Sequence, residues 1–274
     1  MNVAAKALPY VKFVVMALLS LVIVIPLLFI VLNALKSPKE AALMTLGLPS
    51  VWLWDNFTTV FEQGNMLRGL TNSTIVTVGS VALAVVLGVL AAFILGRRTG
   101  KATSSVYLLF VAGLIAPPAI IPTIKLLQGI HLSNQFGGII LLYAALHSPF
   151  LILMMTGFVK GIPKEIDESA YVDGVHGIGL FVRIALPLLL PSITTATVFV
   201  FLGVWNDFQW PLYVLGNSEK WTIPMSVYMF KSKYGTDWNL VFADLIIAML
   251  PVLLVYMFAQ KFIIEEMTAG AIKG

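Results

Sequence analysis

Cysteine is absent from this chain of 274 residues, and histidine is scarce. Without cysteine there is no disulfide, no thiol nucleophile and no thiolate metal site. The three histidines are His131, His147 and His176, and none has a histidine partner four residues away. Because helical pairs of that spacing are typical of metal sites, we expect these histidines to pack or to lie at interfaces, and we expect no bound metal.

Motifs of the common nucleotide-binding and hydrolytic sites are also missing. A phosphate-binding loop needs G-x-x-x-x-G-K-[ST], but the single Gly-Lys pair, Gly100-Lys101, lacks both the earlier glycine and the following hydroxyl. Neither G-x-S-x-G nor H-E-x-x-H occurs. We therefore expect no catalytic residue and no bound cofactor in this chain. Any ATP and Mg²⁺ that drive it must be used by another chain.

Charge is scarce as well, and apolar residues take its place. Only 11% of the residues are charged and 59% are hydrophobic, with a mean hydropathy of +0.95, which no soluble domain of this length shows. A membrane-spanning helix needs about 20 apolar residues. Runs of that length predict an all-α polytopic membrane protein whose single domain, 1–274, has six spans: about 13–35, 72–95, 106–127, 137–159, 192–215 and 241–263.

The basic residues are spread over the loops, so the formal charge of +4 indicates membrane orientation rather than nucleic-acid binding. Lys6 and Lys12 precede the first run, the short loop after the second run is R-R-T-G-K, and the loop after the fourth run is also basic. The positive-inside rule then places both termini in the cytoplasm. A secretory signal is the alternative for residues 1–35, but the run is too long and lacks a clear cleavage site.

The longest polar interruption lies between the fourth and fifth runs, at about 160–191. Pro163 suits a helix start, acidic residues follow it, and Gly174 supplies a stop, so we expect a short helix between Pro163 and Asp173. Gly177 and Gly179 predict a loose connection into an amphipathic turn that Pro187 and Pro191 close.

This interruption resembles the "EAA" loop of the membrane subunits of ATP-binding-cassette importers. Glu168-Ser169-Ala170 is followed by Gly174 and, after nine intervening residues, by I-x-L-P, and the departure is Ser169 where alanine is usual. The resemblance implies a coupling helix that sits in a cleft of the ATPase subunit. The implied coupling residues are Glu168, Ser169, Ala170, Asp173, Gly174, Ile184, Leu186 and Pro187. An amphipathic connector lying on the membrane is the alternative.

Two further segments are similar to the smaller permease subunit of maltose-type carbohydrate importers. They are W-N-D-F-Q-W-P-L at 205–212 and T-A-G-A-I-K-G at the C-terminus. The resemblance implies that the tail, through Ala269, Gly270 and Lys273, contacts the two ATPase subunits. It implies more loosely that 216–239 reaches the substrate-binding protein. A frayed end is the alternative for the tail.

Polar and helix-breaking residues inside the apolar runs are candidates for a translocation pathway. The candidates are Pro117, Pro118, Asn206, Asp207, Gln209 and Asp244. The prolines predict a kinked or broken third span, which either lines the pathway or only bends the helix. Asp207 and Asp244 are expected at similar depth, either in an aromatic belt with Trp205, Trp210 and Trp238 or in a polar mouth that meets a sugar.

The second run carries a different pattern, a small residue at every fourth position. These residues are Ser80, Ala84, Gly88, Ala92 and Gly96. Such a ridge permits close backbone approach, so we expect it to serve helix packing.

Together these features predict a permease subunit of a binding-protein-dependent importer for a sugar or oligosaccharide. Its implied partners are a second permease subunit, two ATPase subunits, a substrate-binding protein and the bilayer, with no nucleic acid. Three alternatives remain at this point: an importer of another small solute, an ion-gradient-driven secondary transporter and a non-transporting membrane scaffold. A secondary transporter needs an intramembrane acid–base relay, for which the apolar runs offer almost nothing.

Overall fold

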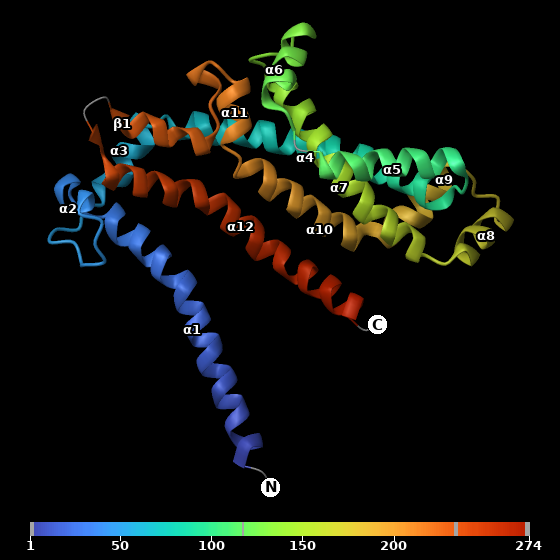
Figure 1. Ribbon diagram of the computed structural model, residues 1–274, viewed down its shortest axis with the longest axis horizontal. Coiled ribbons are helices and arrows are strands. Elements are labelled where there is room, and N and C mark those ends of the chain that lie inside the picture. The colour runs from blue at the N-terminus through green and yellow to red at the C-terminus, as the bar shows by residue number, and fades with distance from the viewer. Residues whose placement is uncertain (1–2, 117, 233–234, 272–274) are drawn as a thin grey trace. The chain divides into compact units, whose positions relative to one another are not determined.

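A computed structural model describes the backbone of residues 3–116, 118–232 and 235–271, which is mostly helical (Figure 1). The predicted all-α class is confirmed. The elements are α1 Val3–Ala34, α2 Pro38–Ala42, α3 Asp55–Gln63, α4 Met66–Arg97, α5 Lys101–Ile115, α6 Ile120–Gly129, α7 Phe136–Gly161, α8 Lys164–Val172, α9 Ile178–Leu180, the π-helix η1 Phe181–Ala185, α10 Leu186–Trp205, α11 Gln209–Val214, the 3₁₀ helices η2 Ser218–Lys220 and η3 Ile223–Phe230, the hairpin strands β1 Lys231–Ser232 and β2 Gly235–Thr236, and α12 Trp238–Ala271.

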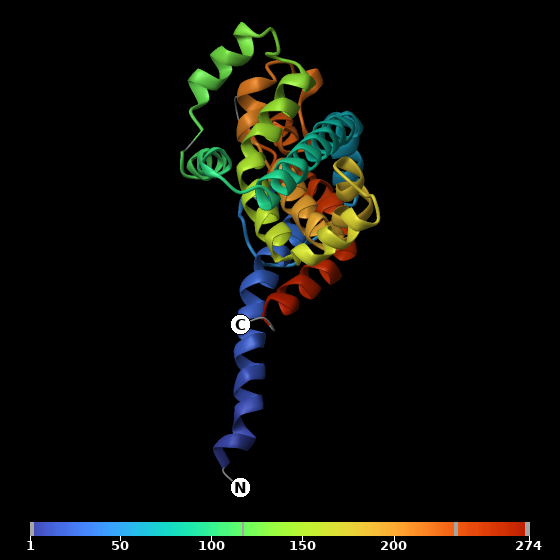
Figure 2. The same cartoon turned by 90° about the vertical axis from the view of Figure 1, so that its right-hand side faces the viewer.

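Within the described ranges, five helical segments are long and apolar enough to cross a membrane. They are Lys12–Ala34, Met66–Arg97, Phe136–Gly161, Ile178–Trp205 and Trp238–Lys261. A sixth span is available if α5 and α6 count together, although their axes are bent by 119°, and Figure 2 shows the wide angle between them. The described part of the chain therefore has five or six candidate spans.

Two predicted spans differ from the helices found. The third, 106–127, is divided between α5 and α6; Pro118 and Ala119 lie between the two helices, and Pro117 lies outside the described residues. The fifth, 192–215, starts earlier and ends sooner, because Leu186 begins α10 and Trp205 ends it. Pro187 and Pro191 lie in α10 rather than closing a turn, because the neighbouring π-helix leads straight into α10. Pro187 fits the first helical turn, whereas Pro191 lies inside the helix.

Contacts within the chain divide it into two compact units. The first comprises Met1–Leu67 and Met225–Leu250, and the second comprises Arg68–Pro224 and Pro251–Gly274. The single-domain organisation predicted from the sequence remains a proposal, and each unit is described by itself below.

The first unit is held by polar side chains at the end of α1. Lys36 is buried, and its Nζ donates to Asn33 Oδ1 at 3.1 Å and to the Thr45 carbonyl at 2.6 Å. Asn56 Nδ2 donates to the carbonyls of Ala34 and Lys36, at 2.8 and 3.0 Å. The bond to Ala34 satisfies the last carbonyl of α1, and the others tie the segment after the helix to its end.

The segment after α1 contains a further set of polar contacts, a capping box at the start of α2. Ser37 caps α2 and Glu40 returns a bond to the Ser37 backbone. The hydroxyl of Ser50, together with Ser37, lowers the pKa of Glu40 to about 2, so this carboxylate stays ionised at neutral pH.

The second unit has an apolar core between α4, α7 and α10. Its buried members include Val76 and Ala92 of α4, Ile139 and Met155 of α7, and Val200 of α10. The small-residue ridge faces this core: Ser80, Ala84 and Ala92 are fully buried. A Cβ at Gly96 would lie 2.5 Å from Val159 Cγ1, and one at Gly88 would lie 3.0 Å from Leu151 Cβ. The predicted packing role of the ridge is therefore confirmed.

Candidate functional site

The short helix α8 is the first candidate site, and the sequence predicted its bounds well. It starts after Pro163, carries Glu165 and Asp167 in its first turn, and ends before Asp173. Acidic side chains there interact favourably with the positive end of the helix dipole. Ser169, which stands where alanine is usual, donates its hydroxyl to the Glu165 carbonyl at 2.8 Å, so it is satisfied within α8.

The C-terminus of α8 forms a Schellman motif around Gly174. The amide of Gly174 donates to the Tyr171 carbonyl at 3.1 Å, and the amide of Val175 donates to the Ala170 carbonyl at 2.9 Å. Gly174 has a φ of +77°, in the left-handed region that favours glycine. The predicted glycine stop is confirmed.

An arginine at the end of α4 anchors α8. Arg97 Nε lies 2.7 Å from Asp167 Oδ2, and Arg97 Nη2 donates to Asp167 Oδ1 at 3.0 Å. Its Nη1 also donates to the Ile162 carbonyl at 2.9 Å, just before α8. Each of the two paired side chains is only 12% exposed. A two-pronged ion pair shielded in this way fixes both the position and the direction of α8 relative to α4.

The face of α8 that the anchor leaves free is acidic and partly apolar. Glu168 and Asp173 are exposed, and Val172 is 89% exposed. A cleft of about 520 Å³ lies between this helix and the end of α4, with Phe93, Arg97 and Glu168 among its lining residues. An exposed helix with mixed apolar and charged surface is suited to docking a partner protein.

The remaining predicted coupling residues lie elsewhere. Ala170 is buried against the rest of the second unit. Ile184 lies in η1, while Leu186 and Pro187 begin α10, and Leu186 packs against the apolar core. The I-x-L-P pattern thus belongs to the start of a spanning helix, where it can hold α10 in place. Its assignment to ATPase coupling stays a prediction.

A second candidate site lies where α7 and α10 approach the short helix α11. Asp207 Oδ2 accepts a hydrogen bond from the Tyr143 hydroxyl at 2.8 Å. The amides of Gln209 and Trp210 donate to the same carboxylate, at 2.8 and 3.4 Å. Asp207 therefore caps the start of α11, which explains why the spanning helix does not continue to residue 215.

The other candidates near this carboxylate point in different directions. Asn206 is exposed and donates back to the Leu202 carbonyl at 3.0 Å, whereas Gln209 and Pro118 line a pocket of about 450 Å³ together with Asp207. Trp205 and Trp210 are buried, at 5% and 7% exposure, and their placement in an aromatic belt stays a prediction.

Asp244 belongs to the first unit and is fully buried there. Its Oδ1 accepts a hydrogen bond from the Ser226 hydroxyl at 2.7 Å. Asp207 lies in the second unit, so the expected pairing of the two acids at one depth stays a prediction. Buried acids of this kind need partners, which Ser226 supplies in part.

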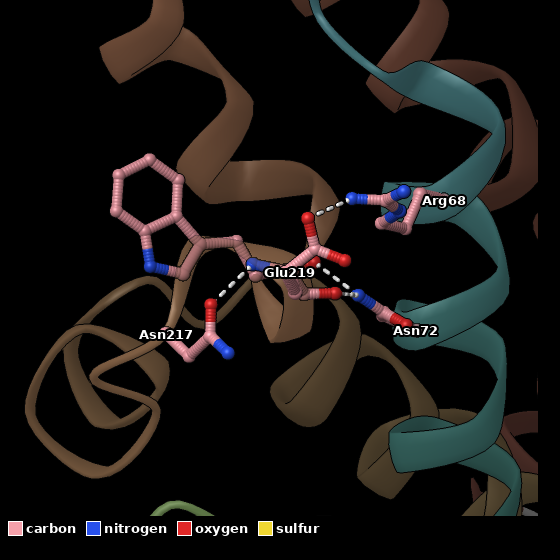
Figure 3. A network of polar contacts seen from close by, with 5 residues as sticks. Arg68, Asn72, Asn217 and Glu219 are labelled. Atoms are coloured by element: carbon pink, nitrogen blue, oxygen red, sulfur yellow. Dashed lines mark hydrogen bonds and ion pairs between the residues drawn. The ribbon is translucent and has the colours of Figure 1, made fainter.

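The first part of the predicted outer loop, 216–224, is tied to the start of α4, as Figure 3 shows. Asn72 Nδ2 donates to the carbonyls of Glu219 and Trp221, both at 2.9 Å, and the Glu219 carboxylate pairs with Arg68. The Glu219 amide donates to Asn217 Oδ1 at 3.0 Å. Asn72 is buried, whereas the Arg68–Glu219 pair is exposed. The hydrogen bonds of the Asn72 side chain therefore contribute more than the ion pair does to holding this segment against α4.

The tail candidates can be placed only in part. Ala269 and Gly270 fall in the last turns of α12, where the backbone alone is described. Lys273 lies outside the described residues. Sequence reasoning missed two residues that the structure brings into these sites, Arg97 and Tyr143, because their partners lie 70 and 64 positions away in the chain.

The apolar spans and the anchored short helix define a polytopic membrane permease with the fold of type I importers. The chain belongs to the family of binding-protein-dependent transport system inner membrane components, whose pattern it matches over residues 3–268. It is 30% identical over 93% of its length to the diacetylchitobiose uptake system permease protein NgcG of Streptomyces coelicolor, 85% of which is covered. It is 31% identical to AmyC of Thermoanaerobacterium thermosulfurigenes, a probable permease protein for starch degradation products, with 93% of each chain covered.

A solved structure supports the fold independently. A chain of a bacterial ABC transporter involved in the import of the acidic polysaccharide alginate superimposes with a TM-score of 0.81, over 95% of this chain and 98% of that one. The sequence identity is 20%, so this likeness concerns the fold alone.

Proposed function

We propose that this chain is one permease subunit of an ATP-driven, binding-protein-dependent importer for a sugar or oligosaccharide. The observation that carries the proposal is α8, a short acidic helix held by Arg97 at its base and exposed on its outer face. Family membership and relatives named for saccharide uptake support the substrate class. The sequence alternatives, another small solute or an ion-gradient-driven transporter, have no structural observation in their favour.

The contacts between Arg97 and α8 suggest how movement of α8 is transmitted to the rest of the chain. Two partner ATPases bind and hydrolyse ATP with Mg²⁺, and the exposed Glu168 and Asp173 contact one of them. Because Arg97 joins α8 to α4, displacement of α8 moves the end of α4 with it. A second permease subunit completes the pathway, and a substrate-binding protein delivers the saccharide. Nucleotide and substrate then couple because each favours one of two states of the same bundle.

The proposed location is the bacterial inner membrane, with both termini in the cytoplasm. The Arg97–Asp167 pair supports the sequence argument, because it puts the R-R-T-G-K loop and α8 at the same end of the second unit. Two basic loops on one side are typical of the cytoplasmic face. The C-terminal residues Ala269, Gly270 and Lys273 would then reach the ATPase subunits.

We expect cysteines at Thr99 and Leu48 to be labelled from opposite sides of the membrane. The native chain has no cysteine, so each variant carries a single reactive site. Leu48 is 75% exposed, so a cysteine there is accessible to the reagent. The nearby Ser50 is left unchanged because its hydroxyl bonds to Glu40. The measurement is labelling by an impermeant maleimide in sealed vesicles of known orientation. Labelling of both residues from one side would overturn the proposed topology.

The function itself is tested by purifying the complete importer and the isolated chain in lipid. We expect the complex to hydrolyse ATP, with stimulation by the liganded binding protein, and the isolated chain to be inactive. Saccharide uptake should need internal ATP and should survive collapse of the ion gradients. Robust hydrolysis by the isolated chain, or uptake that follows an ion gradient, would exclude the proposed function.

A further inference from the structure

His147 lines the 450 Å³ pocket of the second unit, and its neighbours restrict where the ring can lie. Its ring lies over Gly203 of α10, where a Cβ would come within 2.7 Å of the imidazole Cε1 and 3.2 Å of Nε2. The ring also stacks on Tyr143, with centroids 6.3 Å apart and planes inclined by 30°. A glycine therefore provides the space, and a neighbouring ring limits the direction of the imidazole.

Tyr143 is itself held firmly. Its side chain is 1% exposed, and its hydroxyl donates to Asp207 at 2.8 Å. Asp207 in turn accepts bonds from two backbone amides of α11. The carboxylate and the phenol thus have partners, and they act as positioning groups for the imidazole beside them.

The imidazole differs from these groups because it has no hydrogen-bond partner among the described residues. A neutral imidazole offers one donor and one acceptor. It lines a pocket whose volume falls within the range of small-ligand sites, about 300–1,000 Å³. Pro149 and Trp210 contribute apolar surface to the same pocket. One free donor–acceptor pair beside apolar walls fits a sugar, whose hydroxyls need paired partners and whose C–H faces need apolar contact.

We propose that His147 hydrogen-bonds a hydroxyl group of an uncharged saccharide in a subsite that this permease subunit supplies. The inference rests on the function proposed above and adds a contact residue to it. The carboxylate of Asp207 lies close to the subsite and disfavours an anionic ligand there. Gly203 is a positioning residue, since any side chain at that position would push the imidazole aside.

The subsite can be tested by protection of a cysteine from a thiol reagent. Leu114 lines the pocket and is 42% exposed, so Leu114→Cys places a reporter in it. Leu109 lies on the same helix, is 70% exposed and does not line the pocket, so Leu109→Cys is the matched control. The reagent is applied to the complete importer trapped with vanadate, with and without maltotriose or diacetylchitobiose, whichever the wild-type importer takes up.

We expect the transported sugar to slow modification at residue 114 by about fivefold or more and to leave residue 109 unchanged. His147→Leu in the Leu114→Cys background should weaken this protection, so that about three- to tenfold more sugar is needed to reach half of it, because the change removes both polar atoms. His147→Gln keeps one donor and one acceptor and should retain most of it. Loss of one neutral hydrogen bond corresponds to weaker binding by about three- to tenfold.

The outcomes separate the two proposals. If the wild-type importer takes up neither these nor other saccharides, the proposed function is wrong. If it transports a sugar that gives no protection at residue 114, or if His147→Leu needs no more sugar than wild-type His147 for half-maximal protection, the subsite is wrong while the function stands.

Discussion

Arg97→Ala is expected to abolish most coupled transport while leaving the chain in the membrane. The change removes the ion pair with Asp167 and two hydrogen bonds, one to the Asp167 carboxylate and one to the Ile162 carbonyl, and it leaves the Asp167 carboxylate 12% exposed without its partner. Breaking a shielded ion pair from one side typically costs about 3–5 kcal/mol. Even about 2 kcal/mol, allowing for the residual exposure, would populate misplaced positions of α8 and reduce transport by at least tenfold.

Arg98 supplies the matched control because it is the next residue, has the same charge and is exposed. No ion pair to Arg98 occurs among the described residues, so Arg98→Ala should transport within about twofold of the wild type. Arg97→Lys keeps the charge but cannot reach the carboxylate and the carbonyl together, and an intermediate rate is expected. The measurement is ATP-dependent uptake at matched membrane abundance. Equal rates for Arg97→Ala and Arg98→Ala would show that the anchor does not transmit movement.

Local sequence signals predicted the parts of the chain whose structure depends on neighbours along the sequence. The acidic first turn, Pro163 and Gly174 marked both ends of α8 correctly, because capping is decided within a few residues. Apolar runs likewise indicated most of the long helices, although the third and fifth predicted spans differ from the helices found. The small-residue ridge of α4 was also predicted, since its four-residue spacing is visible without knowing which helix packs against it.

Features that depend on distant contacts could not be read from the sequence. The run from 192 to 215 is apolar almost throughout, and only the bonds from Tyr143 and the α11 amides to Asp207 show why α10 stops at Trp205. Likewise, Arg97 looked like an ordinary loop arginine that reports orientation. Its partner on α8 lies 70 residues away, so only the fold brings the two together.

His147 illustrates a third case, in which the residue type was interpreted without its surroundings. A single histidine in an apolar run is usually a packed side chain, and the sequence predicted that role. The structure adds that Gly203 leaves room for the ring, while Tyr143 is tied to Asp207 behind it. A glycine in α10 and a histidine in α7 carry no joint signal in one sequence. The arrangement of residues around the His147 ring can therefore be seen only in the structure.

Gly174→Val is expected to reduce ATPase retention and transport by about tenfold, through the backbone alone. The φ of Gly174 is +77°, and a Cβ there would meet no atom within 4 Å, so steric contact with neighbours plays no part. A left-handed conformation costs a residue with a Cβ about 1–2 kcal/mol, and a β-branched side chain is disfavoured further. The strain acts on the two amide bonds that end α8, and it therefore displaces the exposed surface carrying Glu168 and Asp173.

Two further substitutions separate this backbone effect from a loss of folding. Gly174→Asn should keep most activity, because asparagine tolerates the left-handed region better than other residues with a side chain. Gly157→Val makes the same change within α7, where a Cβ also meets nothing within 4 Å and φ is not positive, so near-wild-type transport is expected. The measurement is ATPase co-purification together with uptake at matched abundance. If Gly174→Val retains the ATPase and transports like Gly174→Asn, the Schellman stop does not position the docking surface, and α8 loses its proposed role in coupling.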